Sequence, residues 1–133
     1  MNKLMANKYH SVLVVDDSEA EQVMIKQIIT SEPFCDQLNV YADARKALDF
    51  IKATPVDQLP EIIFLDIVMP EMDGFQFLNE FEKLSESVRQ KCKIVLLSSS
   101  DSFKDLNRAN KCRYVRRFLN KPLTNSMLQA INF

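Results

Sequence analysis

The sequence predicts a doubly wound α/β domain, in which five parallel strands alternate with five helices. Three of the predicted strands, residues 12–15, 61–65 and 93–97, are short runs that are apolar at almost every position. Strands of this kind are buried on both faces, which is typical of parallel sheets covered by helices. Segments with apolar residues at helical spacing follow the strands. In such sheets, ligands bind at the carboxyl ends of the strands.

The elements follow in order from the first strand. Residues 11–15 form this strand, which ends at a pair of acids. Ser18 and Glu21 then have the spacing of a capping box, which predicts a helix that continues to about Thr30. A weaker strand is expected over residues 37–41.

The third strand lies at the centre of the chain. A helix over residues 43–55 leads to the strand 61–65, which Asp66 closes, and a turn-rich loop runs from there to Gly74. Gly74 is the only glycine in the chain, so we expect it to hold a special backbone position. The remaining predicted elements are a helix over 74–84, a strand over 93–97, a polar helix over 101–111, a strand over 117–120 and a closing helix capped by Thr124.

Length and composition describe one ordinary globular domain. Residues 1–10 form a short N-terminal extension and residues 11–133 one domain. The net charge of −1 argues against non-specific nucleic-acid binding as the main role. Three widely spaced cysteines fit neither a disulfide framework nor a zinc site, so we expect a reducing, cytoplasmic location. No apolar run has membrane-spanning length, and no membrane contact is expected.

Polar residues stand at the ends of four predicted strands. Asp16 and Asp17 follow the first strand, Asp66 the third, Ser98 the fourth and Lys121 the fifth. These ends share one edge of a parallel sheet, so the side chains can converge. Three carboxylates at one place repel one another unless a hard divalent cation such as Mg²⁺ binds there. A carboxylate nucleophile, a cation, an ammonium and a hydroxyl together suit phosphoryl transfer.

Each residue alone has a simpler interpretation. Asp66, or the pair Asp16 and Asp17, could only cap the next turn or helix. Ser98 could be a turn residue, and Lys121 a solvated loop lysine. The basic residues of the C-terminal half could be a solvated face or a partner surface; they are Lys104, Arg108, Lys111, Arg113, Arg116 and Arg117. A reactive site is favoured only because all of these residues stand together at equivalent ends of the predicted strands.

Four segments carry a resemblance to a known family. They are Val14 to Ser18 (VVDDS), Phe64 to Gly74 (FLDIVMPEMDG), Ile94 to Ser99 (IVLLSS) and Phe118 to Pro122 (FLNKP). With them, the chain resembles the CheY-like receiver domains of response regulators from about residue 11 to residue 131. The resemblance implies a flavodoxin-like fold with strand order 2-1-3-4-5.

The resemblance also implies the chemistry of two-component signal transduction. Asp66 would be the phosphoacceptor, taking a phosphoryl group from a phosphohistidine on a sensor histidine kinase or a histidine phosphotransfer protein. Asp17 and Asp66 would ligate Mg²⁺ directly, Asp16 would hold it largely through water, and Val68 would supply its backbone carbonyl. Lys121 and Ser98 would bind the phosphoryl oxygens.

The implied output is a conformational switch. Ser98 would move toward the phosphoryl group and Phe118 would fill the vacated space, repacking the face of the fourth helix, the fifth strand and the fifth helix for an unknown protein partner. The Lys121–Pro122 peptide bond would be cis. Such a domain phosphorylates and dephosphorylates itself but is not a turnover enzyme. Two alternatives remain: a pseudo-receiver, and a Mg²⁺-dependent phosphatase, although Val68 stands where such enzymes usually carry a general acid.

Overall fold

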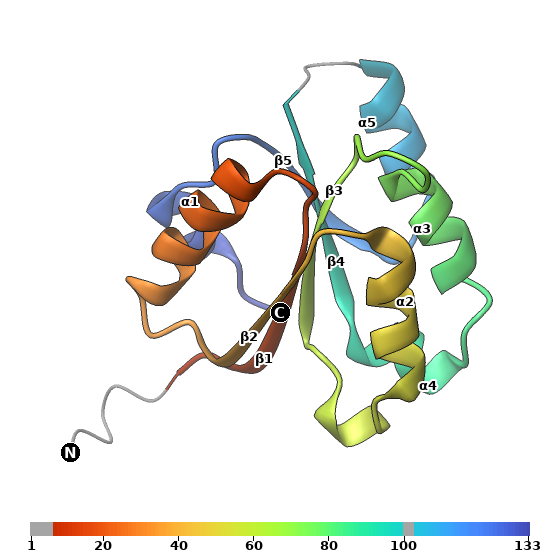
Figure 1. Cartoon of the computed structure of the whole chain (residues 1–133), viewed down its shortest axis with the longest axis horizontal. Coiled ribbons are helices and arrows are strands. Elements are labelled where there is room, and N and C mark those ends of the chain that lie inside the picture. Colours follow the sequence, from red (N-terminus) through yellow and green to blue (C-terminus); the bar gives the residue numbers. More distant parts are fainter. Residues whose placement is uncertain (1–6, 100–102) are drawn as a thin grey trace.

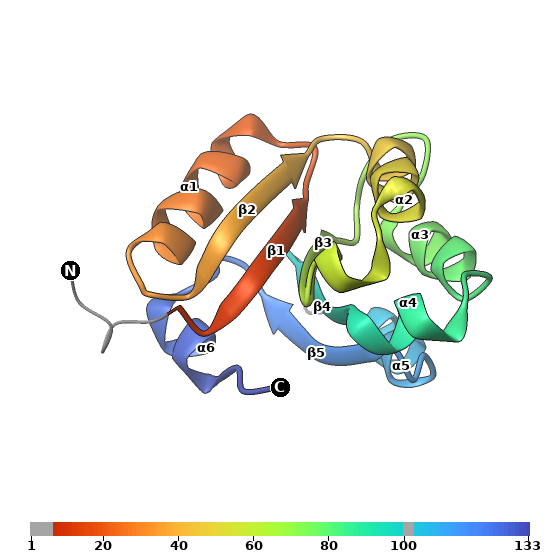
Figure 2. The ribbon, with the colours of Figure 1, turned by 90° about the horizontal axis from the view of Figure 1, so that it is seen from below.

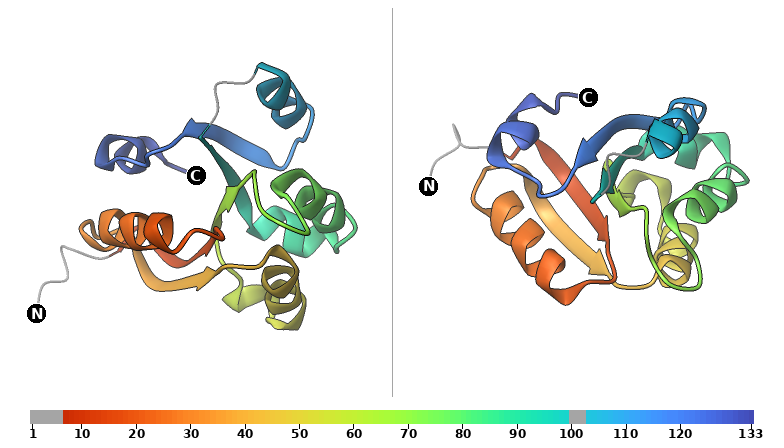
Figure 3. Two further views of the ribbon diagram at one scale, coloured as in Figure 1. Left: turned by 45° about the horizontal axis from the view of Figure 1, so that its top comes forward. Right: turned by 90° about the horizontal axis from the view of Figure 1, so that it is seen from above.

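A computed structural model describes residues 7–99 and 103–133, without the side chain of Phe103. Five parallel strands form one sheet in the order β2-β1-β3-β4-β5, which confirms the predicted fold (Figure 1). The strands are β1 (Tyr9–Val15), β2 (Cys35–Tyr41), β3 (Ile62–Asp66), β4 (Lys93–Ser98) and β5 (Val115–Asn120). Their carboxyl ends lie at the upper side of Figure 1, and the right-hand view of Figure 3 looks onto that edge.

Six α-helices lie in the described residues, one more than predicted. They are α1 (Glu19–Thr30), α2 (Ala44–Ala53), α3 (Gly74–Phe81), α4 (Glu86–Lys91), α5 (Phe103–Asn110) and α6 (Asn125–Ala130), with a single 3₁₀ turn, η2, at Val56–Gln58. The additional helix is α4, seen in front in Figure 2. Ser85 caps it by accepting a hydrogen bond from the Val88 N–H at 3.5 Å. The helix predicted over 74–84 ends early, at Phe81.

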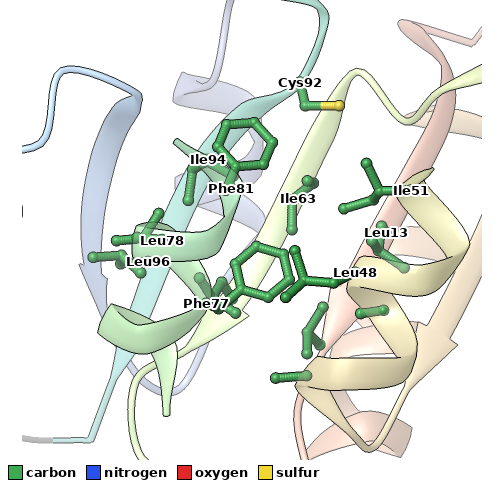
Figure 4. Close-up of a cluster of buried hydrophobic side chains, with 14 of the residues drawn as sticks. Leu13, Leu48, Ile51, Ile63, Phe77, Leu78, Phe81, Cys92, Ile94 and Leu96 are labelled. Carbon is green, nitrogen blue, oxygen red and sulfur yellow. The ribbon is translucent and has the colours of Figure 1, made fainter. Parts of the chain in front are cut away.

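Helices cover both faces of the sheet. Alternate strand residues point to opposite sides, so Leu13 and Ile63 lie in one core and Val14 and Phe64 in another. The first core lies under α2, α3 and α5, and the second under α1 and α6 (Figures 1 and 3). Figure 4 shows the first core, where Phe77 of α3 lies beside Leu48 of α2. Each such side chain contributes roughly 1.5 to 3 kcal/mol when fully buried.

Several boundaries differ from the prediction. Strand β1 begins at Tyr9, so His10 belongs to the sheet and not to the extension. The Tyr9 N–H donates to the Phe34 carbonyl at 2.8 Å, which also explains the early start of β2. Strand β5 begins at Val115 and contains a bulge, because Val115 pairs with Ile94 and Arg117 already pairs with Val95. The first two residues of the helix predicted over 101–111 lie outside the described part.

No helix among the described residues is both long enough and apolar enough to cross a membrane.

Candidate functional site

Two acids and a lysine converge at the carboxyl edge of the sheet, as the sequence predicted. The Lys121 Nζ lies 2.9 Å from the Asp16 Oδ2 and 3.2 Å from the Asp66 Oδ1. Asp16 is fully buried, whereas 6% of the Asp66 surface remains exposed. A third acid, Glu21 of α1, also forms an ion pair with Lys121.

The junction between β1 and α1 fixes Asp16. Its Oδ1 accepts a hydrogen bond from the Ser18 N–H at 2.9 Å, and its carbonyl accepts one from the Gln22 side chain at 2.5 Å. Ser18 caps α1 by accepting from the Glu21 N–H at 3.3 Å. Only this half of the predicted capping box forms, because the Glu21 carboxylate turns to Lys121.

The loop after β3 holds Asp66 through a close backbone approach. A Cβ at Gly74 would lie 2.7 Å from the Asp66 carbonyl oxygen and 2.9 Å from the Ile67 Cα. Gly74 has a negative φ, so this position needs glycine for space and not for its backbone angle. The left-handed residue of the loop is Glu71, with φ 66°. Asp73 then starts α3 with a complete capping box formed with Gln76.

The end of β5 ties Lys121 to the neighbouring strand. The Lys121 N–H donates to the Ser98 carbonyl at 2.7 Å. Ser98 is buried, with 3% of its surface exposed, and ends β4 at the same edge as the acids. The Lys121–Pro122 peptide bond is cis, as the resemblance implies.

Burial dominates the electrostatics of the acids. It raises the pKa of Asp16 from 3.8 to about 6, with a further rise from the nearby charge of Asp66, while the Ser18 N–H and Lys121 act in the opposite direction. Burial also raises the pKa of Asp66, against the attraction of Lys121. Burial would lower the pKa of Lys121, but hydrogen bonds to Glu21 and Asp16 reverse this and raise it.

The acidic cluster differs in one member from the predicted set. Carboxylate oxygens of Asp16, Glu21 and Asp66 lie within 4.8 Å of one another. Asp17 is exposed and lies outside this cluster. Buried carboxylates with raised pKa values suit a hard divalent cation, so the residues fit the implied group. The sequence missed Glu21, because its position three residues after Ser18 already had an explanation as a helix cap.

Val68 and Phe118 are the two remaining predicted residues. The side chain of Val68 is largely exposed, and its N–H hydrogen-bonds to the Asp66 carboxylate. Phe118 is half-buried in β5, pairs with Leu96, and packs against the core under α5. Its neighbours α5 and α6 flank β5 along one edge of the molecule (Figure 2).

Curated relatives match part of this chain. A stretch of 80 residues, 60% of the chain, is 38% identical to a protein-glutamate methylesterase/protein-glutamine glutaminase of Vibrio vulnificus, and covers only 22% of that enzyme. The probable methanogenesis regulatory protein FilR2 of Methanothrix harundinacea is 30% identical over 115 residues, which are 85% of this chain and 72% of FilR2.

Solved structures match nearly the whole chain. A two-component response regulator from Cytophaga hutchinsonii superposes with a TM-score of 0.82 at 27% identity, covering 90% of this chain and 91% of that one. The Mn²⁺-bound form of the response regulator Rcp1 has the same fold, with a TM-score of 0.72 at 22% identity, covering 90% and 87%. Residues 12–132 match the family described as the response regulator receiver domain. The chain therefore belongs to the receiver domains of two-component signalling.

Proposed function

We propose that Asp66 is the phosphoacceptor of this receiver domain and takes its phosphoryl group from a phosphohistidine. The observation that carries the proposal is the ion pair of Asp66 with Lys121, next to the buried Asp16, at the open edge of the sheet. An Asp66 oxygen attacks phosphorus, the bond from phosphorus to the imidazole nitrogen breaks, and the electron pair stays on the imidazole. Lys121 and Ser98 then hold the phosphoryl oxygens.

We further propose that Mg²⁺ is the cation of this site, with Asp17, Asp66 and the Val68 carbonyl as ligands and Asp16 acting largely through water. When bound, such a cation neutralises charge that develops on the phosphoryl oxygens. The raised pKa values of the two buried acids support a cation here. The Mn²⁺ in the Rcp1 structure supports a divalent metal in this fold.

The output we propose is binding of a protein partner at the face of α5, β5 and α6. Ser98 ends β4, and the half-buried Phe118 lies in the adjacent strand β5, which supports a switch on that side. Membership of the family implies a histidine kinase or phosphotransfer protein as the donor. The methylesterase activity in the name of the Vibrio relative is not proposed for this chain, which matches only 22% of that enzyme. The free thiols of Cys35, Cys92 and Cys112 support a reducing, cytoplasmic location.

Intact-mass spectrometry tests the phosphoacceptor. The protein is incubated with acetyl phosphate and Mg²⁺ beside Asp66→Asn and a matched control, Asp49→Asn, which removes an exposed acid of α2. We expect one phosphoryl group on the wild type and on the control, and none on Asp66→Asn. Uptake of the same group by Asp66→Asn would assign the reaction to another residue.

A further inference from the structure

The ion pair between Glu21 and Lys121 has no role in the reaction proposed above. Glu21 lies in the first turn of α1 and keeps 34% of its side chain exposed, whereas only 10% of the Lys121 side chain is exposed. Glu21 is not among the predicted metal ligands, although its carboxylate lies within 4.8 Å of ligand atoms of Asp16 and Asp66.

Lys121 has no hydrogen-bond donor to spare in this state. An ammonium group has three N–H donors. Its nitrogen contacts three carboxylates, those of Asp16, Glu21 and Asp66. A phosphoryl oxygen can therefore reach Lys121 only when one of these acids gives up its contact.

Glu21 is the acid that most directly opposes this exchange. Asp16 and Asp66 would hold the proposed cation and could then release Lys121, so the contact that would still hold the lysine away from the phosphoryl group is the one with Glu21. Among the described residues, the Glu21 carboxylate has Lys121 as its side-chain hydrogen-bond partner, and Glu21 is not one of the proposed metal ligands. We propose that Glu21 is a positioning residue that competes with the phosphoryl group for Lys121 and so opposes phosphorylation. This inference rests on the proposed role of Asp66.

The surroundings of Glu21 allow the exchange without movement of the backbone. Glu21 and Lys121 line a cavity of about 220 Å³ together with Met24, Ile25, Pro122 and Leu123. The partly exposed carboxylate can therefore swing into this space and be hydrated when Lys121 turns to the phosphoryl group. The exchange therefore changes the positions of the Glu21 and Lys121 side chains and leaves the fold unchanged.

The variant Glu21→Gln tests the competition, with Glu19→Gln as the matched control. Both residues are acids in the first turn of α1, and Glu19 is exposed, so the two variants change the charge at the helix start equally. Calorimetry measures the affinity for Mg²⁺ alone, and then for beryllofluoride, a phosphoryl mimic, at saturating Mg²⁺. The Mg²⁺ concentration for each protein is set from its own Mg²⁺ dissociation constant, so that the metal site is saturated in every case.

The proposal requires effects of opposite sign. Glu21→Gln should bind Mg²⁺ more weakly, because a negative charge is lost and Lys121 turns to the metal ligands. It should bind beryllofluoride about tenfold more tightly, the size expected for removing a partly exposed unit charge beside an anion. Glu19→Gln should match the wild type in both measurements. Urea unfolding of each variant beside the wild type separates a misfolded variant from a folded one that binds both ligands weakly.

Other results overturn the inference or the function beneath it. Weaker binding of both ligands by a folded Glu21→Gln would mean that Glu21 preorganises Lys121. Equal changes in the two affinities for Glu21→Gln and Glu19→Gln would mean that Glu21 has no specific role. Tighter Mg²⁺ binding would contradict the charge argument. A wild type that binds no beryllofluoride with Mg²⁺ would instead refute the role of Asp66.

Discussion

Neutralising Asp16 should stabilise the metal-free protein while weakening its metal site. Burial raises the pKa of Asp16 from 3.8 to about 6. Above that pH, the ionised Asp16 carboxylate therefore lowers the free energy of unfolding. Each pKa unit corresponds to about 1.4 kcal/mol, which makes the ionised carboxylate destabilising by about 3 kcal/mol at pH 8. In Asp16→Asn, the amide oxygen can still accept from the Ser18 N–H. The variant should therefore be about 3 kcal/mol more stable than the wild type in a chelator.

The pH dependence follows from the same raised pKa. Below about pH 3, Asp16 is protonated in both the folded and unfolded states, so the variant and the wild type should have equal free energies of unfolding. The wild type loses stability relative to the variant as the pH rises from about 4 to about 6, and the difference stays constant above that range. Urea unfolding in a chelator at several pH values measures this difference.

Two further measurements separate charge from general damage. Asp17→Asn removes the exposed neighbouring acid and should change the free energy of unfolding by less than about 0.5 kcal/mol. Mg²⁺ at a hundredfold excess over its dissociation constant should stabilise the wild type by about 2.7 kcal/mol and Asp16→Asn by less. An Asp16→Asn protein that is less stable than the wild type at pH 8, or a difference that does not vary with pH, would refute the reasoning.

Two predictions concern the loop after β3. Gly74→Ala places a Cβ 2.7 Å from the Asp66 carbonyl oxygen and 2.9 Å from the Ile67 Cα, so it should lower the free energy of unfolding by more than about 2 kcal/mol in urea; an unchanged midpoint would contradict this close approach. Glu71→Val puts a β-branched residue at φ 66° and should cost about 1 to 2 kcal/mol, whereas Glu71→Asn should be neutral or slightly stabilising. Equal stabilities of these two Glu71 variants would count against a left-handed residue there.

The strands and the position of the site were predictable because both follow from local patterns and topology. Runs such as Phe64 and Leu65, apolar on both faces, occur in strands covered by helices on either side. Once the strands are parallel, Asp66 and Lys121 must share an edge, although they are far apart in sequence. This reasoning needs no knowledge of side-chain contacts, and it placed the residues that converge.

The missed features depend on contacts that no local pattern contains. Glu21 fits a capping box with Ser18, and only the fold brings Lys121 close enough to draw its carboxylate away. Gly74 was expected to be special, but its reason is the backbone of Asp66 beside it, which is a tertiary contact. Helix α4 is a single short stretch whose one half-buried apolar residue, Val88, gives too little periodicity to detect.

The crystal structure of the protein with Mg²⁺ and beryllofluoride tests the central claim most directly. It should show beryllium bonded to a carboxylate oxygen of Asp66, with Lys121 and Ser98 on the fluorine atoms and the metal on Asp17, Asp66 and the Val68 carbonyl. Beryllofluoride bound at another side chain, or a Lys121 that leaves the fluorine atoms uncontacted, would contradict the assignment of Asp66 and its partners.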